Sequence, residues 1–163
     1  TQQLPEEDRH NYSQSYLVTR LTVIMGGRAA EKLVFDEVSS GAESDLKEAT
    51  RLGRYMVTHW GMSERIGPVA YRVGEEHMFL GKEIQESRDF SEHTSRIIDE
   101  EVTRILQEAD ERARALITDN RHDLDRLAEA LVKREVLTSP EIEEILTGAP
   151  ENAEAEAAPV KNM

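Results

Sequence analysis

The most informative stretch of this chain reads Ser40-Gly41-Ala42-Glu43-Ser44-Asp45-Leu46-Lys47-Glu48-Ala49-Thr50-Arg51-Leu52-Gly53-Arg54. A glycine-containing approach leads to an acidic residue at the start of an amphipathic segment. Small and apolar residues then recur at helical spacing, namely Leu46, Ala49, Gly53, Met56, Val57 and Trp60. The pattern predicts a helix that ends near Trp60, with Gly61 as its C-terminal stop.

Asp45 is the candidate functional residue of this helix. A carboxylate in the first turn is favoured by the helix dipole and by the free backbone N–H groups there. One interpretation is a metal ligand, because a fixed, ionised carboxylate suits a cation. The other is an ordinary structural role, since Asp is common at helix N-termini. Position alone leaves both interpretations open.

Four segments of the chain resemble the FtsH family, the membrane-anchored ATP-dependent zinc metalloproteases. They occur in the family's order and with similar spacing, within about residues 1–72, and the helical part to about Leu146 is compatible with the family. The resemblance implies that Asp45 is the third protein ligand of a catalytic zinc ion. The four segments are Leu4–His10, Met25–Glu31, Ser39–Leu46 and Met56–Pro68.

The chain departs from the family in its histidines. The family's other two zinc ligands and its general base lie in a His-Glu-x-x-His helix, which precedes the segment that begins here at Thr1. No two of the five histidines are four residues apart, and we interpret His59 as a packing partner at a helix end. We therefore expect residues 1–148 to be the C-terminal part of a zinc peptidase domain, with no catalytic residue besides the ligand Asp45. The histidines are His10, His59, His77, His93 and His122.

Composition excludes several functions. The 33 acidic and 20 basic residues give a formal charge of −13, which argues against nucleic acid as a partner because phosphate contacts need clustered cations. The sequence has no cysteine, so disulfides and thiolate zinc sites are excluded. No apolar run reaches the roughly 20 residues of a membrane span, and no phosphate-binding G-x-x-x-x-G-K-[ST] loop occurs. We expect any membrane anchor and the ATPase to lie upstream.

The periodicity predicts an all-α fold of about five helices. At most a short extended segment is expected near residues 69–73, and a polar loop over 74–90. Residues 149–163 are rich in Ala, Glu and Pro, which predicts a disordered acidic tail. The expected helices cover about 11–33, 43–60, 91–118, a segment around 124–132, and 139–147.

Two finer features concern these helices. Gly26-Gly27 interrupts the first helix, and we favour close packing of another backbone there over a simple bend or break. The long helix after Ser91 carries a charged face that we expect to be solvated. That face comprises Glu100, Glu101, Arg104, Glu108, Glu111, Arg112 and Arg114.

The resemblance implies ATP-dependent proteolysis by a zinc endopeptidase. It further implies unfolded or membrane proteins as substrates, a homohexamer, and a location at the cytoplasmic face of the cell membrane. ATP would bind only in the ATPase domain, outside this chain. The alternative is a catalytically silent helical module for interaction or assembly. An upstream His-Glu-x-x-His helix and the zinc content of the longer protein would separate the two.

Overall fold

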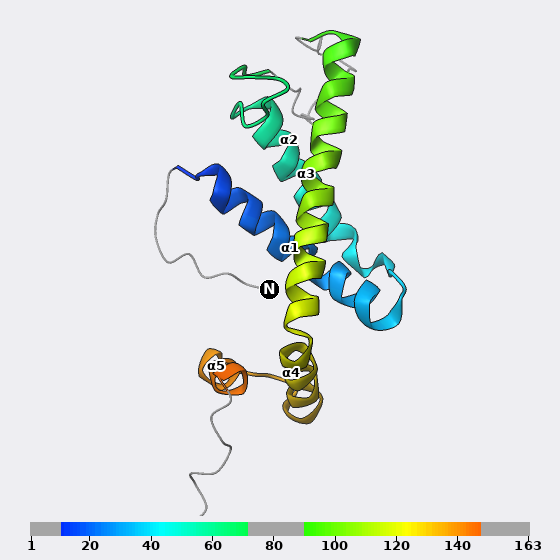
Figure 1. Ribbon diagram of the computed structural model, residues 1–163, viewed down its shortest axis with the longest axis vertical. Coiled ribbons are helices and arrows are strands. Elements are labelled where there is room, and N and C mark those ends of the chain that lie inside the picture. The colour runs from blue at the N-terminus through cyan, green and yellow to red at the C-terminus, as the bar shows by residue number, and fades with distance from the viewer. Residues whose placement is uncertain (1–10, 72–89, 148–163) are drawn as a thin grey trace, which may run out of the picture. The chain divides into compact units, whose positions relative to one another are not determined.

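The computed structural model describes residues 11–71 and 90–147, and the regular secondary structure within these ranges is all helical. The elements are α1 (Gln14–Phe35), the 3₁₀ turn η1 (Ser40–Ala42), α2 (Glu43–Thr58), α3 (Glu92–Asp119), α4 (Arg121–Arg134) and α5 (Ser139–Thr147) (Figure 1). This confirms the all-α prediction of about five helices. The described part of the 69–73 segment contains no strand. The rest of that segment, nearly all of the 74–90 loop and the predicted tail lie outside the described residues.

The chain divides into two compact units, residues 1–118 and 119–163. The interpretation of residues 1–148 as part of one peptidase domain stays a prediction. No helix in the described ranges combines the length and the apolar character that crossing a bilayer requires.

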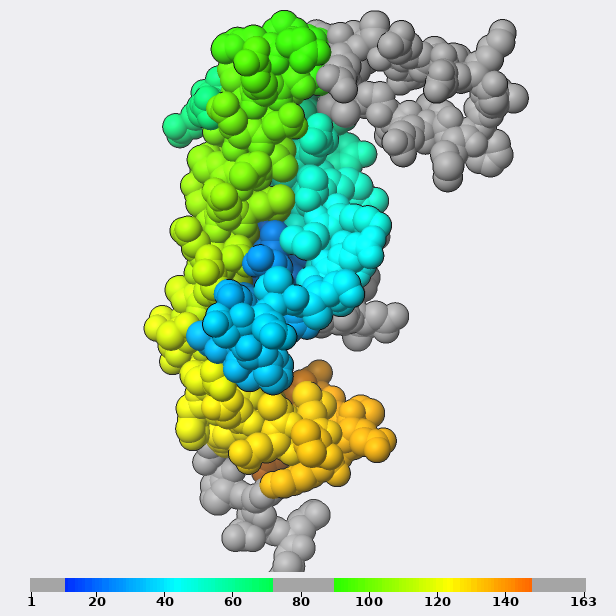
Figure 2. Space-filling view, turned by 90° about the vertical axis from the view of Figure 1, so that its right-hand side faces the viewer, coloured from blue at the N-terminus to red at the C-terminus, as the bar shows by residue number. Residues whose placement is uncertain are grey.

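The core of the first unit is shared by α1, α2 and α3. Apolar side chains one helical turn apart on each helix point to this core, and α3 lies alongside α2 (Figure 2). The approach is close at Gly53 of α2, where an added Cβ would lie 3.7 Å from Val102 and 3.8 Å from Leu106 of α3. The buried core residues are Leu17, Leu21, Met25, Ala29, Ala49, Met56, Val57, Ile98, Val102, Ile105, Ala109 and Ala113.

Local signals explain where these helices begin and end. Ser13 precedes α1 and accepts the Tyr16 N–H at 3.2 Å, which satisfies one of the free donors of the first turn. Ser91 does the same for α3, accepting the Thr94 N–H at 3.2 Å, as the sequence predicts. At the end of α2, Gly61 adopts a positive φ of 60°, which suits the residue that turns the chain away from a helix.

The glycine pair of α1 does not behave as expected. α1 continues through Gly26 and Gly27 without a break. A Cβ added at either position would meet nothing within 4 Å. The close packing of another backbone is therefore absent among the residues that the structure describes, and so is the alternative break.

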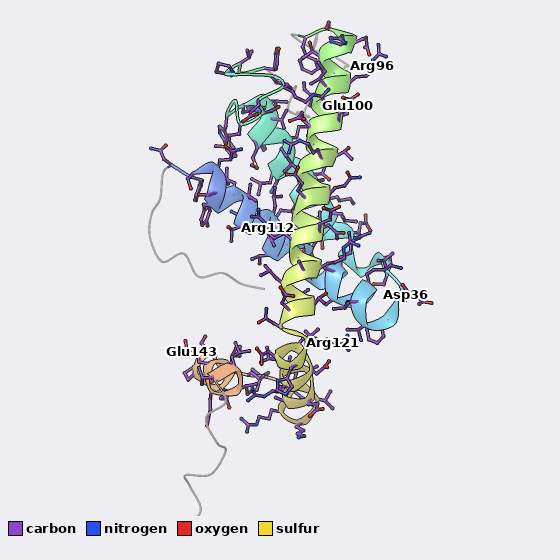
Figure 3. All side chains as sticks on the ribbon, viewed as in Figure 1. Asp36, Arg96, Glu100, Arg112, Arg121 and Glu143 are labelled. Carbon is purple, nitrogen blue, oxygen red and sulfur yellow. The ribbon has the colours of Figure 1, made fainter. Side chains whose placement is uncertain are left out.

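The second unit contains α4 and α5. At the start of α5, the Glu141 carboxylate accepts the Thr138 N–H at 2.7 Å and the Thr138 hydroxyl at 2.6 Å. Neither helix has a buried residue. Several large apolar side chains are instead exposed on this unit, namely Leu131, Val132, Val136 and Leu146. The charged residues Arg121 and Glu143 of these helices are labelled in Figure 3.

Candidate functional site

Asp45 lies in the first turn of α2, as the sequence predicts. Ala42 is the residue that precedes the helix, so Asp45 is its third residue and not its N-cap. The Asp45 side chain is exposed and has no hydrogen bond or ion pair with any described residue. A capping hydrogen bond of Asp45 is therefore not observed, and its carboxylate oxygens are open to an external cation.

The turn η1 fixes the start of α2 without a side-chain cap. The Glu43 N–H donates to the Ser40 carbonyl, so the turn itself satisfies one of the free N–H groups of the first turn of α2. Gly41 is suited to this turn because a Cβ there would lie only 3.1 Å from Ser39 Oγ. The absence of a side chain at Gly41 therefore allows the backbone to form the tight turn that precedes Asp45.

Glu31 of α1 tethers the segment before η1. Its carboxylate accepts the Ser39 N–H at 3.1 Å and the Ser39 hydroxyl at 3.1 Å. Ser39 Oγ in turn accepts the Gly41 N–H at 3.1 Å. A chain of hydrogen bonds thus runs from α1 to the turn that precedes α2 and Asp45. Sequence reasoning missed this role of Glu31, because nothing in helical periodicity indicates a bond between residues separated by a loop.

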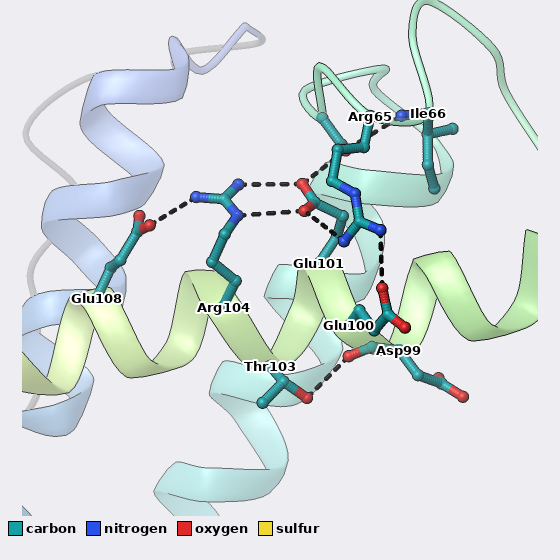
Figure 4. Close-up of polar contacts among 9 residues, drawn as sticks. Arg65, Ile66, Asp99, Glu100, Glu101, Thr103, Arg104 and Glu108 are labelled. Atoms are coloured by element: carbon teal, nitrogen blue, oxygen red, sulfur yellow. Dashed lines mark hydrogen bonds and ion pairs between the residues drawn. The ribbon is translucent and has the colours of Figure 1, made fainter.

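A second polar cluster holds the segment that follows α2 (Figure 4). Glu101 of α3 is only 1% exposed and accepts a hydrogen bond from Ser63 Oγ at 2.8 Å. The Arg104 guanidinium donates to both Glu101 oxygens, at 3.2 and 3.0 Å. Arg65 reaches Glu101 at 3.5 Å and Glu100 at 2.8 Å. The cluster therefore joins α3 to the turn after α2.

The electrostatics of this cluster favour an ionised Glu101. The Arg104 hydrogen bonds lower the pKa of the Glu101 carboxyl below its ordinary value, and the Ser63 hydroxyl adds to this against the opposing effect of burial. The expectation of a wholly solvated charged face on α3 is therefore wrong at Glu101. The sequence does contain a signal for the burial of Glu101. It lies three residues after Ile98 and four before Ile105, which places it on the core side of the helix.

His59 is placed as the sequence predicts, at the end of α2. Its Nδ1 lies 2.7 Å from Thr58 Oγ1, and its ring packs on Tyr55 with 4.6 Å between ring centroids. Within residues 11–71 and 90–147, no three His, Cys, Asp or Glu side chains come together as a metal site. Asp45 therefore belongs to no such group among the described residues.

Comparison with known proteins agrees with the resemblance noted in the sequence. The family model of Peptidase family M41 matches residues 1–145. The chain is 55% identical over 158 residues to the ATP-dependent zinc metalloprotease FtsH 4 of Sphaerobacter thermophilus, which covers 97% of this chain and 24% of that protein. It is 51% identical over 151 residues to the ATP-dependent zinc metalloprotease FtsH of Nitrosococcus oceani, covering 93% and 24% respectively. The chain thus spans about a quarter of the length of these relatives.

Proposed function

The chain belongs to peptidase family M41, and from this premise we propose that it is part of the peptidase domain of an ATP-dependent zinc metalloendopeptidase. The observation that carries the proposal is Asp45, an exposed carboxylate without a described partner, in the first turn of a well-packed helix. The relatives are named as zinc metalloproteases, and the segment around Asp45 is one of the four that resemble the FtsH family.

The residues present suit zinc as one part of a larger site. Catalytic zinc has three protein ligands and an open position, and the described residues contribute Asp45 alone. The other two ligands and the general base would come from a His-Glu-x-x-His helix outside this chain. When bound, zinc activates a water molecule and polarises the carbonyl of the peptide bond that is cut.

The residues of this chain would hold the site in place. Asp45 supplies the anionic ligand, and the Glu31–Ser39 hydrogen bonds fix the turn before it. Helix α2 is anchored behind Asp45 by the buried residues Ala49, Met56 and Val57. The backbone that carries Asp45 is therefore fixed before a metal binds, so only the short Asp45 side chain has to be ordered.

The wider assignments rest on the family alone. They are unfolded or membrane proteins as substrates, a homohexameric assembly, ATP binding in a separate ATPase domain, and a membrane-anchored parent protein at the cytoplasmic face of the cell membrane. The alternative, a catalytically silent helical module, is favoured by one observation: α4 and α5 bury none of their own side chains. Exposed Val132 and Val136, 85% and 73% accessible, suit a surface that another protein segment covers.

Metal analysis of the longer gene product that contains this chain tests the proposal. We expect about one zinc ion per subunit and ATP-dependent cleavage of an unfolded protein. Removal of zinc with a chelator should abolish cleavage, and added zinc should restore it. A full-length protein that binds no zinc and cleaves nothing would favour the silent module.

A further inference from the structure

A groove runs along the surface where α1 meets α2. It has a volume of about 250 Å³, which is below the usual size of a pocket for a drug-sized ligand and suits a single large side chain. The Trp60 and Tyr55 rings stack at one end, with 5.9 Å between their centroids. Its lining residues are Arg20 from α1 and Glu48, Arg51, Leu52, Tyr55 and Trp60 from α2 and its end.

The groove is cationic although the chain is strongly acidic. Two arginines and one glutamate line it, in a protein with a formal charge of −13. Arg20 is paired with Glu48 at 3.0 Å, whereas Arg51 is exposed and has no ion pair with a described residue. The Arg51 guanidinium therefore carries the uncompensated positive charge of the groove. The aromatic surface of the same groove includes Trp60, which is 46% exposed. An apolar side chain next to a carboxylate complements both features.

The groove lies in line with Asp45 on α2. Residues three or four apart on a helix share a face, so Asp45, Glu48 and Leu52 follow one another along it. From Asp45 to Leu52 the axial distance is about 10 Å, at about 1.5 Å per residue. An extended peptide covers that distance with about three residues. A substrate with its cleaved bond near Asp45 would thus place a side chain about three residues away in the groove.

We propose that the groove is a substrate subsite that binds a large apolar side chain about three residues from the cleaved bond, with Arg51 contacting a neighbouring carboxylate of the substrate. This inference rests on the proposed function, since it uses Asp45 as the position of the reaction. Trp60 and Arg51 are then specificity-determining residues with separate roles. Trp60 selects the apolar side chain, and Arg51 selects the acidic neighbour.

Peptide cleavage by the full-length protein tests these roles. The probes are short peptides with one mapped cleavage site and Phe-Glu, Ala-Glu or Phe-Gln placed one to five residues away on either side. We expect kcat/KM to be highest with Phe about three residues from the cleaved bond. Trp60→Ala should reduce the preference for Phe over Ala about fivefold, because an open apolar subsite contributes modest selectivity. Arg51→Gln should reduce only the preference for Glu over Gln.

The matched control is Arg112→Gln, which removes an exposed arginine of α3 that does not line the groove (Figure 3). It should change neither preference. Unchanged preferences in Trp60→Ala and Arg51→Gln would overturn the proposal, as would a parent protein without any preference at these positions.

Binding measurements separate this inference from the proposed function. In full-length Asp45→Asn protein, fluorescence anisotropy should show the labelled Phe-Glu peptide binding more weakly when Trp60→Ala is added. If the parent cleaves no peptide but binding still depends on Trp60, the proposed reaction fails and the groove stands as a peptide site. Binding that is independent of both Trp60 and Arg51 shows that the peptide does not occupy the groove, and overturns the proposal.

Discussion

Ser63 and Glu101 are joined by a buried hydrogen bond of 2.8 Å between the turn after α2 and the middle of α3. The two residues are 38 positions apart, and both side chains are at most 2% exposed. The Glu101 carboxylate also accepts hydrogen bonds from Arg104, so each of its oxygens has a donor. A buried carboxylate that is satisfied in this way contributes to stability only as long as its partners remain.

Replacing Glu101 by Gln should destabilise the first unit. The amide keeps the size of the side chain but replaces one acceptor oxygen by an NH2 group. Because Arg104 donates to both oxygens, this NH2 group faces an Arg104 donor whichever way the amide is turned. Arg104 is 47% exposed and stays hydrated, so the loss should be about 1–3 kcal/mol and below the cost of stranding a fully buried charge. Urea denaturation of the chain measures it. Glu111→Gln, at an exposed position of the same helix, should change the free energy of unfolding by less than about 0.5 kcal/mol.

The stabilisation by Glu101 should also depend on pH. Its folded-state pKa is lowered from an ordinary value of 4.5, chiefly by Arg104. A carboxyl group with a lowered folded pKa stabilises the fold above the unfolded pKa, and this contribution is lost as the pH falls through the folded pKa. The free-energy difference between wild type and Glu101→Gln should therefore be constant above about pH 5.5 and shrink below pH 4.5. A difference that is the same at pH 7 and pH 3.5 would contradict an ionised Glu101.

The first helix yields a test of the glycine pair. Gly27→Ala should stabilise the chain by about 0.5–1 kcal/mol, because alanine favours the helix and its Cβ would meet no atom within 4 Å. Thermal denaturation measures the change. Gly67→Ala is the contrast, since Gly67 has a φ of +81° and an alanine there is strained. A destabilising Gly27→Ala would show that a neighbour does approach this helix closely.

How much of this structure the sequence predicts depends on how local the interactions are. The helices and the Ser91 cap follow from periodicity and from donors within one turn, and both are confirmed. Asp45 was placed correctly on its helix for the same reason. The roles of Glu31 and Glu101 do not follow from the sequence, because Ser39 lies in the loop after α1 and Ser63 in the turn after α2. At Gly26-Gly27 none of the described residues packs closely, because a glycine shows that space is available but not what fills it.

Ser39 offers a test of the link between α1 and Asp45. Ser39→Ala removes the hydroxyl that donates to Glu31 and accepts from Gly41. We expect a loss of about 1 kcal/mol in stability and, in the full-length protein, a larger loss of proteolysis than stability explains. Ser13→Ala removes a comparable cap at the far end of α1, and it should cost similar stability without affecting cleavage at temperatures well below the melting point. If the two variants cleave the unfolded protein equally well, Ser39 does not contribute to the geometry of the site.

The proposed zinc ligand is tested by substitution of Asp45 in the full-length protein. Asp45→Asn keeps the shape of the side chain but removes the negative charge, and Asp45→Ala removes the ligand altogether. Both should abolish cleavage of an unfolded protein and lower the bound zinc, because an open catalytic site has only three protein ligands. ATP hydrolysis should persist, since we assign it to another domain.

The matched control for Asp45 is Glu43→Gln, because Glu43 is the other acidic residue in the first turn of α2. Both substitutions remove a charge that interacts favourably with the helix dipole, at a cost of about 0.3–1 kcal/mol. Glu43→Gln also removes an exposed ion pair with Lys47, which adds at most about 0.5 kcal/mol. If Asp45 acts only through the dipole, the two variants should lose similar stability and both should cleave normally below their melting points. If Asp45 binds zinc, only its own variants lose metal and activity while their melting temperatures stay close to that of Glu43→Gln. Asp45→Ala protein with normal zinc and normal cleavage would return Asp45 to a purely structural role.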